Sequence, residues 1–214
     1  MATTGQGRRR YDARNRQSQA QESRDRILVV ARRLFVAHGY AGTSIARIAA
    51  EAGVSAPTVF AGFKSKVNLL KEAVDTAIAG DTEQRPLRDR PVLLRIHQGR
   101  TFDEVVERMA SAFAEVAERS YPIYAVVHGA ADSDPQIATL LRELDQQRLI
   151  GAGLLAATVA QRLGTDRVDE IRDSLWVLMS PLQYGLIVRG RGRPIAYYRN
   201  WMAQALRSLL PPLE

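Results

Sequence analysis

The stretch that best indicates the fold is residues 43–66, TSIARIAAEAGVSAPTVFAGFKSK. Its pattern predicts two short helices joined by a tight turn. Apolar residues recur at helical spacing in the first half of this stretch: Ile45, Ile48, Ala49 and Ala52. Gly53 follows as a helix stop, since glycine adopts the left-handed conformation of a C-terminal cap without steric cost. Ser55 is a suitable N-terminal cap for the next helix, and Pro57 is tolerated in its first turn.

The second helix of this stretch has two chemically different faces. Val59 and Phe63 form a buried face at helical spacing. The other face is mostly small, polar or basic: Ala56, Pro57, Thr58, Phe60 and Lys64. Two short helices with a glycine turn and such an outer face are typical of a helix-turn-helix that reads DNA.

Helices are also predicted on both sides of this motif. Residues 23–38 contain an apolar stripe, begin with Ser23 as a candidate cap and end at Gly39. A further helix is expected over about 66–79. We therefore predict a DNA-binding domain at residues 23–80 with a three-helix head.

Residues 1–22 are polar and basic, with arginines among glycine, glutamine, serine and asparagine: Arg8, Arg9, Arg10, Arg14 and Arg16. They show no apolar periodicity, so we expect a disordered arm. Such an arm could lie along phosphates or enter a minor groove of DNA. A solubilising tail without a fixed register is the alternative.

The positive charge of the sequence is concentrated in its first part. The formal net charge is +7. Residues 1–80 hold 13 lysines and arginines and 6 acidic residues, whereas residues 81–214 hold 17 of each kind. The whole excess lies in the part that contains the helix-turn-helix, which favours a polyanionic partner such as double-stranded DNA. A merely solvated basic tail is the alternative reading of this count.

Residues 81–214 are predicted to form a second domain, because Gly80, Pro86 and Pro91 mark a boundary. Pro181 should kink one of the helices of this domain. Strand-like alternation is not found, so the predicted fold class is all-α with about nine helices. Those of the second domain are expected at about 87–97, 102–119, 121–132, 135–163, 166–189 and 195–210.

The last two predicted helices are unusually apolar. A helix that is apolar nearly all round, as over 166–189, must be buried on several sides. We expect residues 166–210 to form the interface of a homodimer. The alternative is that both helices only complete the core of the monomer.

Several classes of function lack their sequence signals. Cysteine is absent, which excludes disulfides and thiolate metal sites. The three histidines match no zinc spacing, and neither a P-loop nor a G-x-S-x-G motif occurs. Neither a run of about 18 apolar residues nor a signal-peptide pattern occurs, so we expect no membrane span and a cytoplasmic location. We accordingly expect no enzyme, no cofactor and no metal site.

The residues above resemble the TetR family of transcriptional regulators. The resemblance rests on A-x-x-L-F-x-x-x-G-Y at 31–40, TSIARIAAEAGVSAPTVF at 43–60 and K-S-K-x-x-L-L at 64–70. It implies a homodimeric regulator, most commonly a repressor, that binds a pseudo-palindromic operator and releases it when a small-molecule effector binds. Residues 81–214 would then form the ligand-binding and dimerisation domain.

The resemblance also implies which residues contact DNA. Thr43 would hold a phosphate at the start of the first motif helix, and Lys66 would bind another phosphate. Pro57 and Thr58 would face base edges from the front of the second motif helix. The full set of candidate DNA-binding residues is Thr43, Ser44, Arg47, Ser55, Ala56, Pro57, Thr58, Phe60, Lys64 and Lys66.

Two positions depart from the family pattern. Phe60 replaces the usual tyrosine, so the expected hydroxyl contact to a phosphate is missing. Gly62 replaces the usual histidine, which removes another contact and weakens the end of the helix. Arg47, on the exposed side of the first motif helix, could supply a compensating contact.

An effector pocket is expected in the second domain. Its candidate lining residues are mostly apolar or aromatic: Phe102, Met109, Phe113, Tyr124, His128, Leu155, Trp176 and Met179. The alternative for each is an ordinary core position. Two other functions stay open, namely an architectural protein that binds DNA of any sequence and an enzyme built on a helical pocket.

Overall fold

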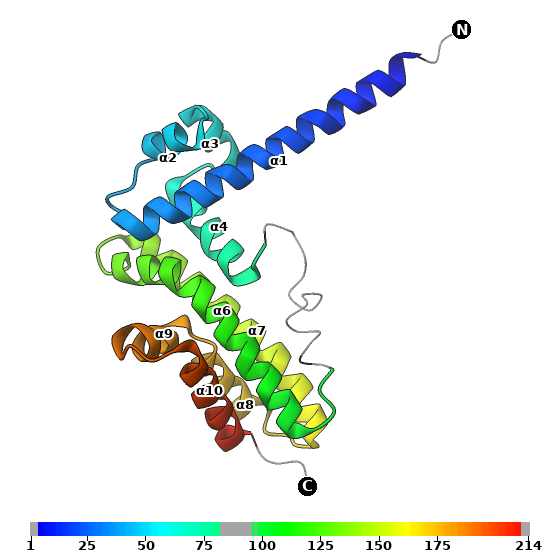
Figure 1. Ribbon diagram of the computed structural model, residues 1–214, viewed down its shortest axis with the longest axis vertical. Coiled ribbons are helices and arrows are strands. Elements are labelled where there is room, and N and C mark those ends of the chain that lie inside the picture. The colour runs from blue at the N-terminus through cyan, green and yellow to red at the C-terminus, as the bar shows by residue number, and fades with distance from the viewer. Residues whose placement is uncertain (1–3, 82–95, 97, 211–214) are drawn as a thin grey trace. The chain divides into compact units, whose positions relative to one another are not determined.

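The computed structural model describes residues 4–81, 96 and 98–210, with side chains from residue 18 onward, and divides into two units, Met1–Ala73 and Val74–Glu214. This described part of the chain forms nine α-helices and one short π-helix, and it contains no strand (Figure 1). The predicted all-α class is therefore confirmed. None of the helices in these ranges is long and apolar enough to cross a membrane.

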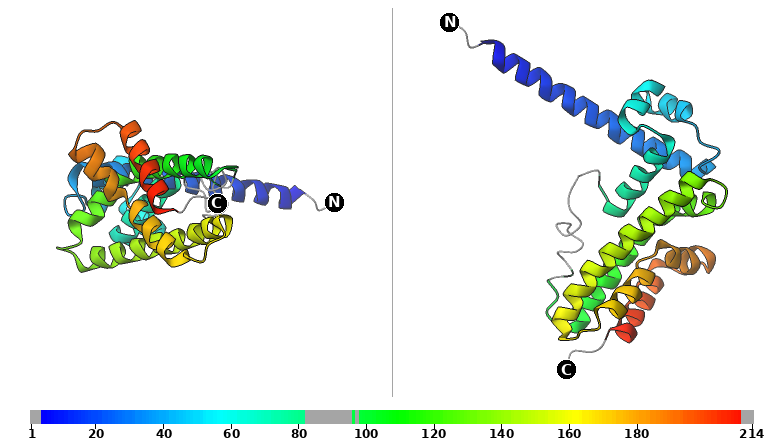
Figure 2. Two further views of the ribbon diagram at one scale, coloured as in Figure 1. Left: turned by 90° about the horizontal axis from the view of Figure 1, so that it is seen from below. Right: turned by 180° about the vertical axis from the view of Figure 1, so that it is seen from behind.

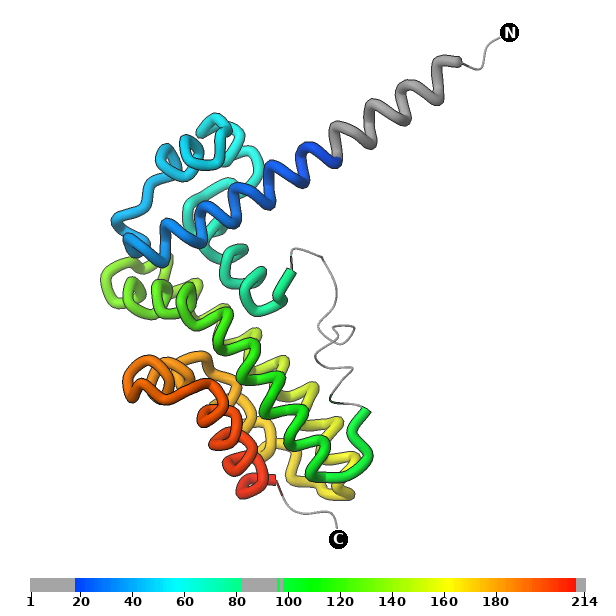
Figure 3. The backbone as a smooth tube through the Cα atoms, in the orientation of Figure 1, coloured from blue at the N-terminus to red at the C-terminus, as the bar shows by residue number. Residues whose placement is uncertain are grey.

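The first unit contains α1 (Thr4–His38), α2 (Ile45–Ala52) and α3 (Ala56–Phe63), together with the start of α4 (Lys66–Ala79). Figure 3 shows the backbone passing from α2 through a tight turn into α3. This geometry confirms the predicted helix-turn-helix. The apolar stripes of these helices are buried, and the side chains with the lowest exposure include Ala31, Leu34, Phe35, Ile48, Val59, Leu69 and Leu70.

The prediction of a disordered arm at residues 1–22 is wrong from Thr4 onward, because α1 begins there. Proline does not occur in α1, and its many arginines, glutamines and alanines are good helix formers. Side chains one turn apart also pair, as where the Gln21 amide donates to the Asp25 carboxylate at 2.9 Å. A segment without an apolar stripe can continue a helix whose other half is anchored in a core.

The second unit contains α6 (Phe102–Ala130), α7 (Pro135–Leu163), α8 (Val168–Leu178), α9 (Pro181–Tyr184), the π-helix η2 (Gly185–Gly190) and α10 (Ile195–Leu209). The ends of α7 are those predicted. Asp134 caps its first turn, and Gly164 ends it with a φ of 63°. Helix α7 packs against both α6 and α8 (Figure 2). The helix predicted over 87–97 lies almost wholly outside the described residues.

Helix α6 is continuous where two helices were predicted. Pro122 lies inside it and removes one backbone hydrogen bond. Burial compensates for this loss, because Ser120, Ile123 and Tyr124 on both sides of the proline are nearly inaccessible to solvent. The Ser120 hydroxyl also donates to the Val116 carbonyl at 2.7 Å. Packing therefore overrides the local helix-breaking signal.

The helix predicted over 166–189 is interrupted at Ser180. This residue has an extended backbone (φ −68°, ψ 126°) and caps α9, which begins at Pro181. The proline thus starts a new helix, whereas only a kink was predicted. Gly185 of η2 then faces α6: a Cβ at this position would lie 2.1 Å from Cε2 of Tyr121. The missing side chain allows the close approach of these two elements.

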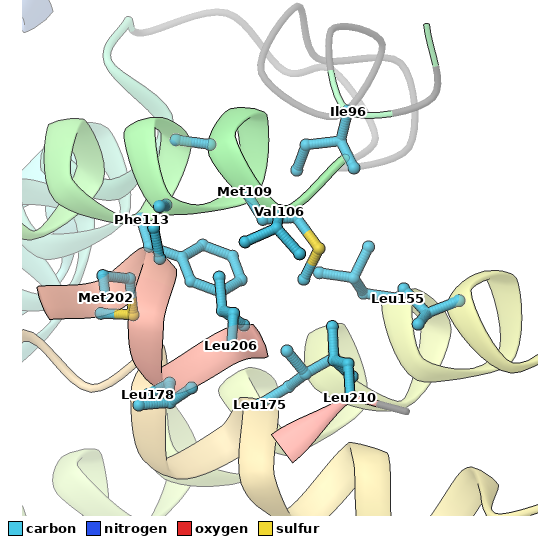
Figure 4. Packing of buried hydrophobic residues seen from close by; sticks show 14 of the residues in the cluster. Ile96, Val106, Met109, Phe113, Leu155, Leu175, Leu178, Met202, Leu206 and Leu210 are labelled. Atoms are coloured by element: carbon cyan, nitrogen blue, oxygen red, sulfur yellow. The ribbon is translucent and has the colours of Figure 1, made fainter. Parts of the chain in front are cut away.

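The core of the second unit is formed by α6, α7, α8 and α10. Figure 4 shows side chains of these helices, among them Met109, Phe113 and Leu206, directed toward one another. The apolar stripe of α10 is buried in this core, since Tyr198, Met202 and Leu206 are 0% exposed. This stripe therefore completes the core of the monomer, which was the alternative reading of the last helix.

The C-terminal end of α4 is held by Arg119 of α6. Its Nε donates to the Ala77 carbonyl at 2.8 Å, and its Nη2 donates to the Ile78 carbonyl at 2.7 Å. Carbonyls in the last turn of a helix have no partner within the helix, and a cation there also has the favourable sign for the helix dipole. Arg119 thus acts as a long-range cap of α4.

Candidate nucleic-acid interface

The outward face of α3 carries the residues predicted to read DNA. Val59 and Phe63 are 0% and 2% exposed, and their burial determines which face of α3 points outward. Phe60 lies on the outward face with 51% exposure, which is high for a large apolar side chain. The exposed positions of α3 are Pro57, Thr58, Phe60, Ala61 and Gly62.

Both helices of the motif are capped by serine. The Ser44 hydroxyl accepts from the Arg47 N–H at 3.2 Å, and the Ser55 hydroxyl accepts from the Thr58 N–H at 3.2 Å. Gly53 joins the helices with a φ of 68°, which confirms the predicted left-handed stop. The first cap is Ser44, the residue directly before α2. Each of these hydrogen bonds joins residues close in sequence, so the motif fixes its own turn.

The side chains of Thr43 and Lys66 form hydrogen bonds within the first unit. Thr43 is 1% exposed, and its hydroxyl is within hydrogen-bond distance of the Gly39 carbonyl at 2.8 Å and the Leu34 carbonyl at 3.1 Å. The Lys66 ammonium donates to the carbonyls of Tyr40 and Thr43 at 2.9 and 3.0 Å and lies 4.0 Å from the Tyr40 ring centroid. In this geometry the Thr43 hydroxyl is buried on backbone carbonyls, and the Lys66 ammonium is bound to two of them. Both residues instead fix the turn between α1 and α2.

Arg47 lies on the exposed side of α2 and belongs to an ion-pair network. Its Nε donates to the Glu51 carboxylate at 3.1 Å, and Arg33 of α1 pairs with the same carboxylate. Hydrogen bonds from Arg47 and then Arg33 hold the pKa of Glu51 below its usual range. The Arg47 side chain is 46% exposed, so its outer N–H groups can donate to a phosphate while Nε stays on Glu51.

Lys64 follows α3 in a strained backbone conformation. Its φ of 64° and ψ of −37° accompany a hydrogen bond from the Ser65 N–H to the Phe63 carbonyl at 2.7 Å, which closes a γ-turn. A positive φ is uncommon for a lysine and requires support from the surrounding structure. The turn ends α3 abruptly and leaves Lys64 exposed beside the candidate reading face.

Arg24 of α1 contacts the end of α3, and the sequence pattern does not reveal this role. Its Nη1 donates to the Gly62 carbonyl at 2.7 Å, and its Nη2 pairs with Glu72 of α4. The guanidinium carbon also lies 4.3 Å from the Phe63 ring centroid. The sequence shows only an arginine near the start of an apolar stripe, whereas its acceptor lies 38 residues away.

The structure places the predicted pocket residues in several different surroundings. Met109, Phe113 and Leu155 lie together in the core of the second unit, with Met179 partly buried against it (Figure 4). Phe102 lines a depression of about 310 Å³ formed mainly by the start of α6 and the end of α7. His128 is exposed near the end of α6 and does not belong to this core. In the described ranges, no three histidine, aspartate or glutamate side chains are grouped to hold a metal ion.

Tyr124 and Trp176 belong to a polar cluster that joins α6, α7 and α8. The Tyr124 hydroxyl donates to the Asp145 carboxylate at 2.7 Å, and Arg148 donates to that hydroxyl at 3.1 Å and to Asp145 at 3.0 Å. The Trp176 indole N–H donates to the Asp145 carbonyl at 3.2 Å. Burial raises the pKa of Tyr124 to about 12. This network holds three helices together, which is a structural role.

Comparison with known proteins identifies the first unit. The sequence profile of bacterial regulatory proteins of the TetR family matches residues 27–73, which run from α1 through the helix-turn-helix into α4. This segment of the chain belongs to the TetR family. Over 60 residues it is 43% identical to the HTH-type transcriptional regulator AcrR of Shigella flexneri, a match that covers 28% of this chain and 28% of AcrR. The chain thus spans less than a third of the length of this curated relative.

Solved structures extend the TetR-family fold to the second unit. A protein of Rhodococcus sp. described as a TetR-family transcriptional regulator is 16% identical, with a TM-score of 0.68 over 89% of this chain and 100% of that chain. A Mesorhizobium loti protein of the same description is 20% identical, with a TM-score of 0.63 over 89% and 96%. At these identities the likeness shows the fold alone. The matched profile is one of bacterial regulatory proteins and the curated relative is a transcriptional regulator, which agrees with the prediction that this chain is not an enzyme.

Proposed function

We propose that this TetR-family chain is a ligand-responsive transcriptional repressor that binds a pseudo-palindromic operator as a homodimer. The observation that carries the proposal is the outward face of α3, which is capped at Ser55, free of acidic residues and, apart from Phe60, lined by small side chains. A helix of this kind fits a major groove, where small side chains let its backbone approach the base edges. The excess of positive charge in residues 1–80 supports the same partner, and chromosomal DNA would place the protein in the cytoplasm.

The proposed contacts divide into base edges and phosphates. Pro57 and Thr58 at the front of α3 face base edges, and Phe60 offers an apolar surface to thymine methyl groups. Phosphates lie near the N-terminal ends of α2 and α3, where helix termini favour anions. The residues that we assign to the phosphate contacts are Ser44, Arg47, Ser55, Ala56 and Lys64, while Thr43 and Lys66 act indirectly by holding the turn before α2.

The homodimer interface is proposed within residues 166–210. Four large apolar side chains in this segment are 44% to 67% exposed, namely Val177, Leu186, Tyr197 and Leu209. Exposed apolar side chains that gather in one part of a chain often mark a protein–protein contact. A two-fold dimer would present two α3 helices to half-sites about 34 Å apart, one turn of DNA.

The effector is proposed to be a small, mostly apolar molecule that binds within the second unit. The side chains around Met109, Phe113 and Leu155 support this choice, because methionine and aromatic residues repack readily around apolar ligands. Release of DNA requires that the effector bind the DNA-free arrangement more tightly than the DNA-bound one. Coupling of about tenfold between effector and operator affinity corresponds to about 1.4 kcal/mol.

Thr58→Glu tests the DNA assignment at an exposed position, where the substitution replaces the contact of the Thr58 hydroxyl with the Ser55 hydroxyl at 2.7 Å. Thr58 is the third residue of α3 after its cap Ser55, so a glutamate there completes a capping box and supports the start of the helix. The same side chain places a negative charge against the DNA. We expect operator affinity to fall by about 100-fold or more in a gel-shift titration, with an unchanged or higher melting temperature.

Gln136→Glu is the matched control for this variant. It adds the same charge in the first turn of α7, where Asp134 is the cap, and should change operator affinity by less than about twofold. The operator itself would be selected from random double-stranded fragments. Recovery of a palindrome supports the regulator. Equal binding to all sequences would support an architectural protein, and full affinity of Thr58→Glu would refute the assignment of α3.

The interface is tested by substituting charged residues into it, because removal of residues 166–210 would also remove part of the monomer core. Val177 and Leu186 are exposed, so Val177→Asp and Leu186→Asp leave that core intact. Sedimentation should show monomers for the double variant and dimers for the parent. Dimers of unchanged stability in the variant would place the interface elsewhere.

A further inference from the structure

We propose that Arg24 is the positioning residue of the DNA-reading helix, because it fastens the C-terminal end of α3 to α1 and α4. The inference rests on the DNA-binding function proposed above. It adds the residue that holds the C-terminal end of α3 in place, while burial of Val59 and Phe63 sets which face points outward. Arg24 does not need to touch DNA for this role.

The first observation concerns the carbonyls at the end of α3. The helix has eight residues, so carbonyls without a partner in the helix are a large share of its polar groups. The Lys64 N–H donates to the Phe60 carbonyl at 2.8 Å, and the Ser65 N–H donates to the Phe63 carbonyl at 2.7 Å. The Gly62 carbonyl receives its hydrogen bond from Arg24 at 2.7 Å. One bond from α1 therefore completes what the γ-turn leaves open.

The second observation is that a single guanidinium joins three helices. From α1 it donates to Gly62 of α3, lies 4.3 Å from the Phe63 ring centroid and pairs with Glu72 of α4. The planar fork of arginine can make these contacts at the same time, whereas a lysine ammonium is a point charge on a flexible chain. The positive charge also has the favourable sign at the C-terminus of α3.

The third observation is that, apart from the buried Phe63 side chain, this end of α3 has little other support. Gly62 carries no side chain, and a glycine inside a helix destabilises it by about 1 kcal/mol relative to alanine. An open groove lies between α1 and α3 beside Arg24, lined in part by Gln19, Ser23, Thr58 and Ala61. The Ser55 cap holds the N-terminal end of α3. Arg24 has the corresponding role at the C-terminal end, after Phe60.

The role of Arg24 predicts a specific signature in binding experiments. Loss of a charge-assisted hydrogen bond changes an equilibrium by roughly tenfold, so Arg24→Gln should weaken operator binding by about tenfold. Binding to unrelated DNA should change by less than about twofold, because phosphate contacts dominate it. The salt dependence of binding should stay the same, since no phosphate contact is removed. Arg24→Lys, which keeps the charge beside Glu72, should fall between these limits.

Arg26→Gln is the control, because it removes the same charge two positions away. Arg26 is exposed and donates to the Ser23 hydroxyl of its own helix at 3.1 Å. Its binding to operator and to unrelated DNA should equal that of the parent. An Arg24→Gln protein that is folded and keeps its preference for the operator would overturn the proposal. An equal loss on both DNAs with a weaker salt dependence would also overturn it, because Arg24 would then be a phosphate contact.

Hydrogen exchange of the full chain tests the same role without DNA. In Arg24→Gln the amides at the end of α3 and in the γ-turn, including those of Lys64 and Ser65, should exchange roughly tenfold faster, while those of α2 should not change. Equal exchange in both proteins would refute the positioning role. A parent protein without sequence preference would refute the proposed function, and the exchange result would still decide the role of Arg24.

Discussion

The helix-turn-helix of the first unit and the helices of the second unit are held in shape by contacts of different range. In the first unit, Ser44, Gly53 and Ser55 set the helix ends through hydrogen bonds that span a few residues. In the second unit, the deciding contacts join distant segments, as where the buried Met202 and Leu206 of α10 belong to one core with Phe113 of α6. A short DNA-reading motif needs local rigidity, whereas a helical domain of this size depends on packing between its helices.

Substitution of Gly185 should give the largest effect and test the long-range side of this comparison. A Cβ at this position would lie 2.1 Å from Cε2 of Tyr121, 64 residues earlier in the sequence, so the Tyr121 ring or the helix that carries it must move. We expect Gly185→Ala to lower the free energy of unfolding by about 3 kcal/mol, measured by urea denaturation. The double variant Gly185→Ala with Tyr121→Ala should not lose stability additively, because the smaller side chain removes the clash. Additive losses would contradict the steric explanation.

Substitution of Gly53 tests the local side. This residue has a φ of 68°, and an added Cβ would meet nothing within 4 Å, so backbone conformation alone opposes a side chain. Gly53→Ala should lower the free energy of unfolding by about 1–2 kcal/mol. Gly53→Asn should lose less, because asparagine tolerates this conformation. If both variants lost the same amount, a cause other than the left-handed turn would be needed.

Removal of the Tyr198 hydroxyl should stabilise the second unit. This side chain is 0% exposed, and within the described part of the chain its hydroxyl has no hydrogen-bond partner. Its ring packs edge-on against Tyr184 and stacks on Trp201, with centroids 5.7 and 5.8 Å apart, and phenylalanine keeps both contacts. We expect Tyr198→Phe to raise the free energy of unfolding by about 1 kcal/mol. Tyr124→Phe is the contrasting variant and should destabilise, since that hydroxyl is bonded to Asp145.

The smallest effect is expected at Gly62 in the reading helix. Here φ is not positive, and an added Cβ would meet only Nη1 of Arg24 at an ordinary 3.6 Å. Gly62→Ala should raise the free energy of unfolding by about 0.5–1 kcal/mol through helix propensity. A loss of stability would mean that the extra methyl group displaces Arg24 from the Gly62 carbonyl. Comparison with the Gly53→Ala variant separates helical glycines from turn glycines in the same motif.

Prediction from sequence was successful where neighbouring residues decide the structure. Gly53 and Ser55 have the predicted roles, and α7 has the predicted ends. The sequence could not decide the contacts of a residue that has a choice between solvent and a distant partner. Lys66 and Thr43 could be read as surface groups, but the turn after α1 buries or binds both. Such a choice depends on the three-dimensional neighbours, which a linear pattern does not contain.

Helix continuity shows the same limit in both directions. Pro122 signalled an end of helix that burial of the flanking residues overrides. Residues 4–22 lacked an apolar stripe and yet continue α1, because the second half of that helix is anchored. His128 was grouped with the pocket by residue type, but it is exposed near the end of α6.

By itself, the sequence determined the all-α class, the helix-turn-helix and its outward face, because caps, turn glycines and apolar periodicity act over a few residues. Only the tertiary structure decided which charged groups are free for DNA and which hold the head together. Arg24 is the clearest case, since its acceptor on Gly62 lies 38 residues away and its partner Glu72 lies 48 residues away. Contacts over such separations follow from the packing of helices, and packing is a property of the folded chain and not of any one segment.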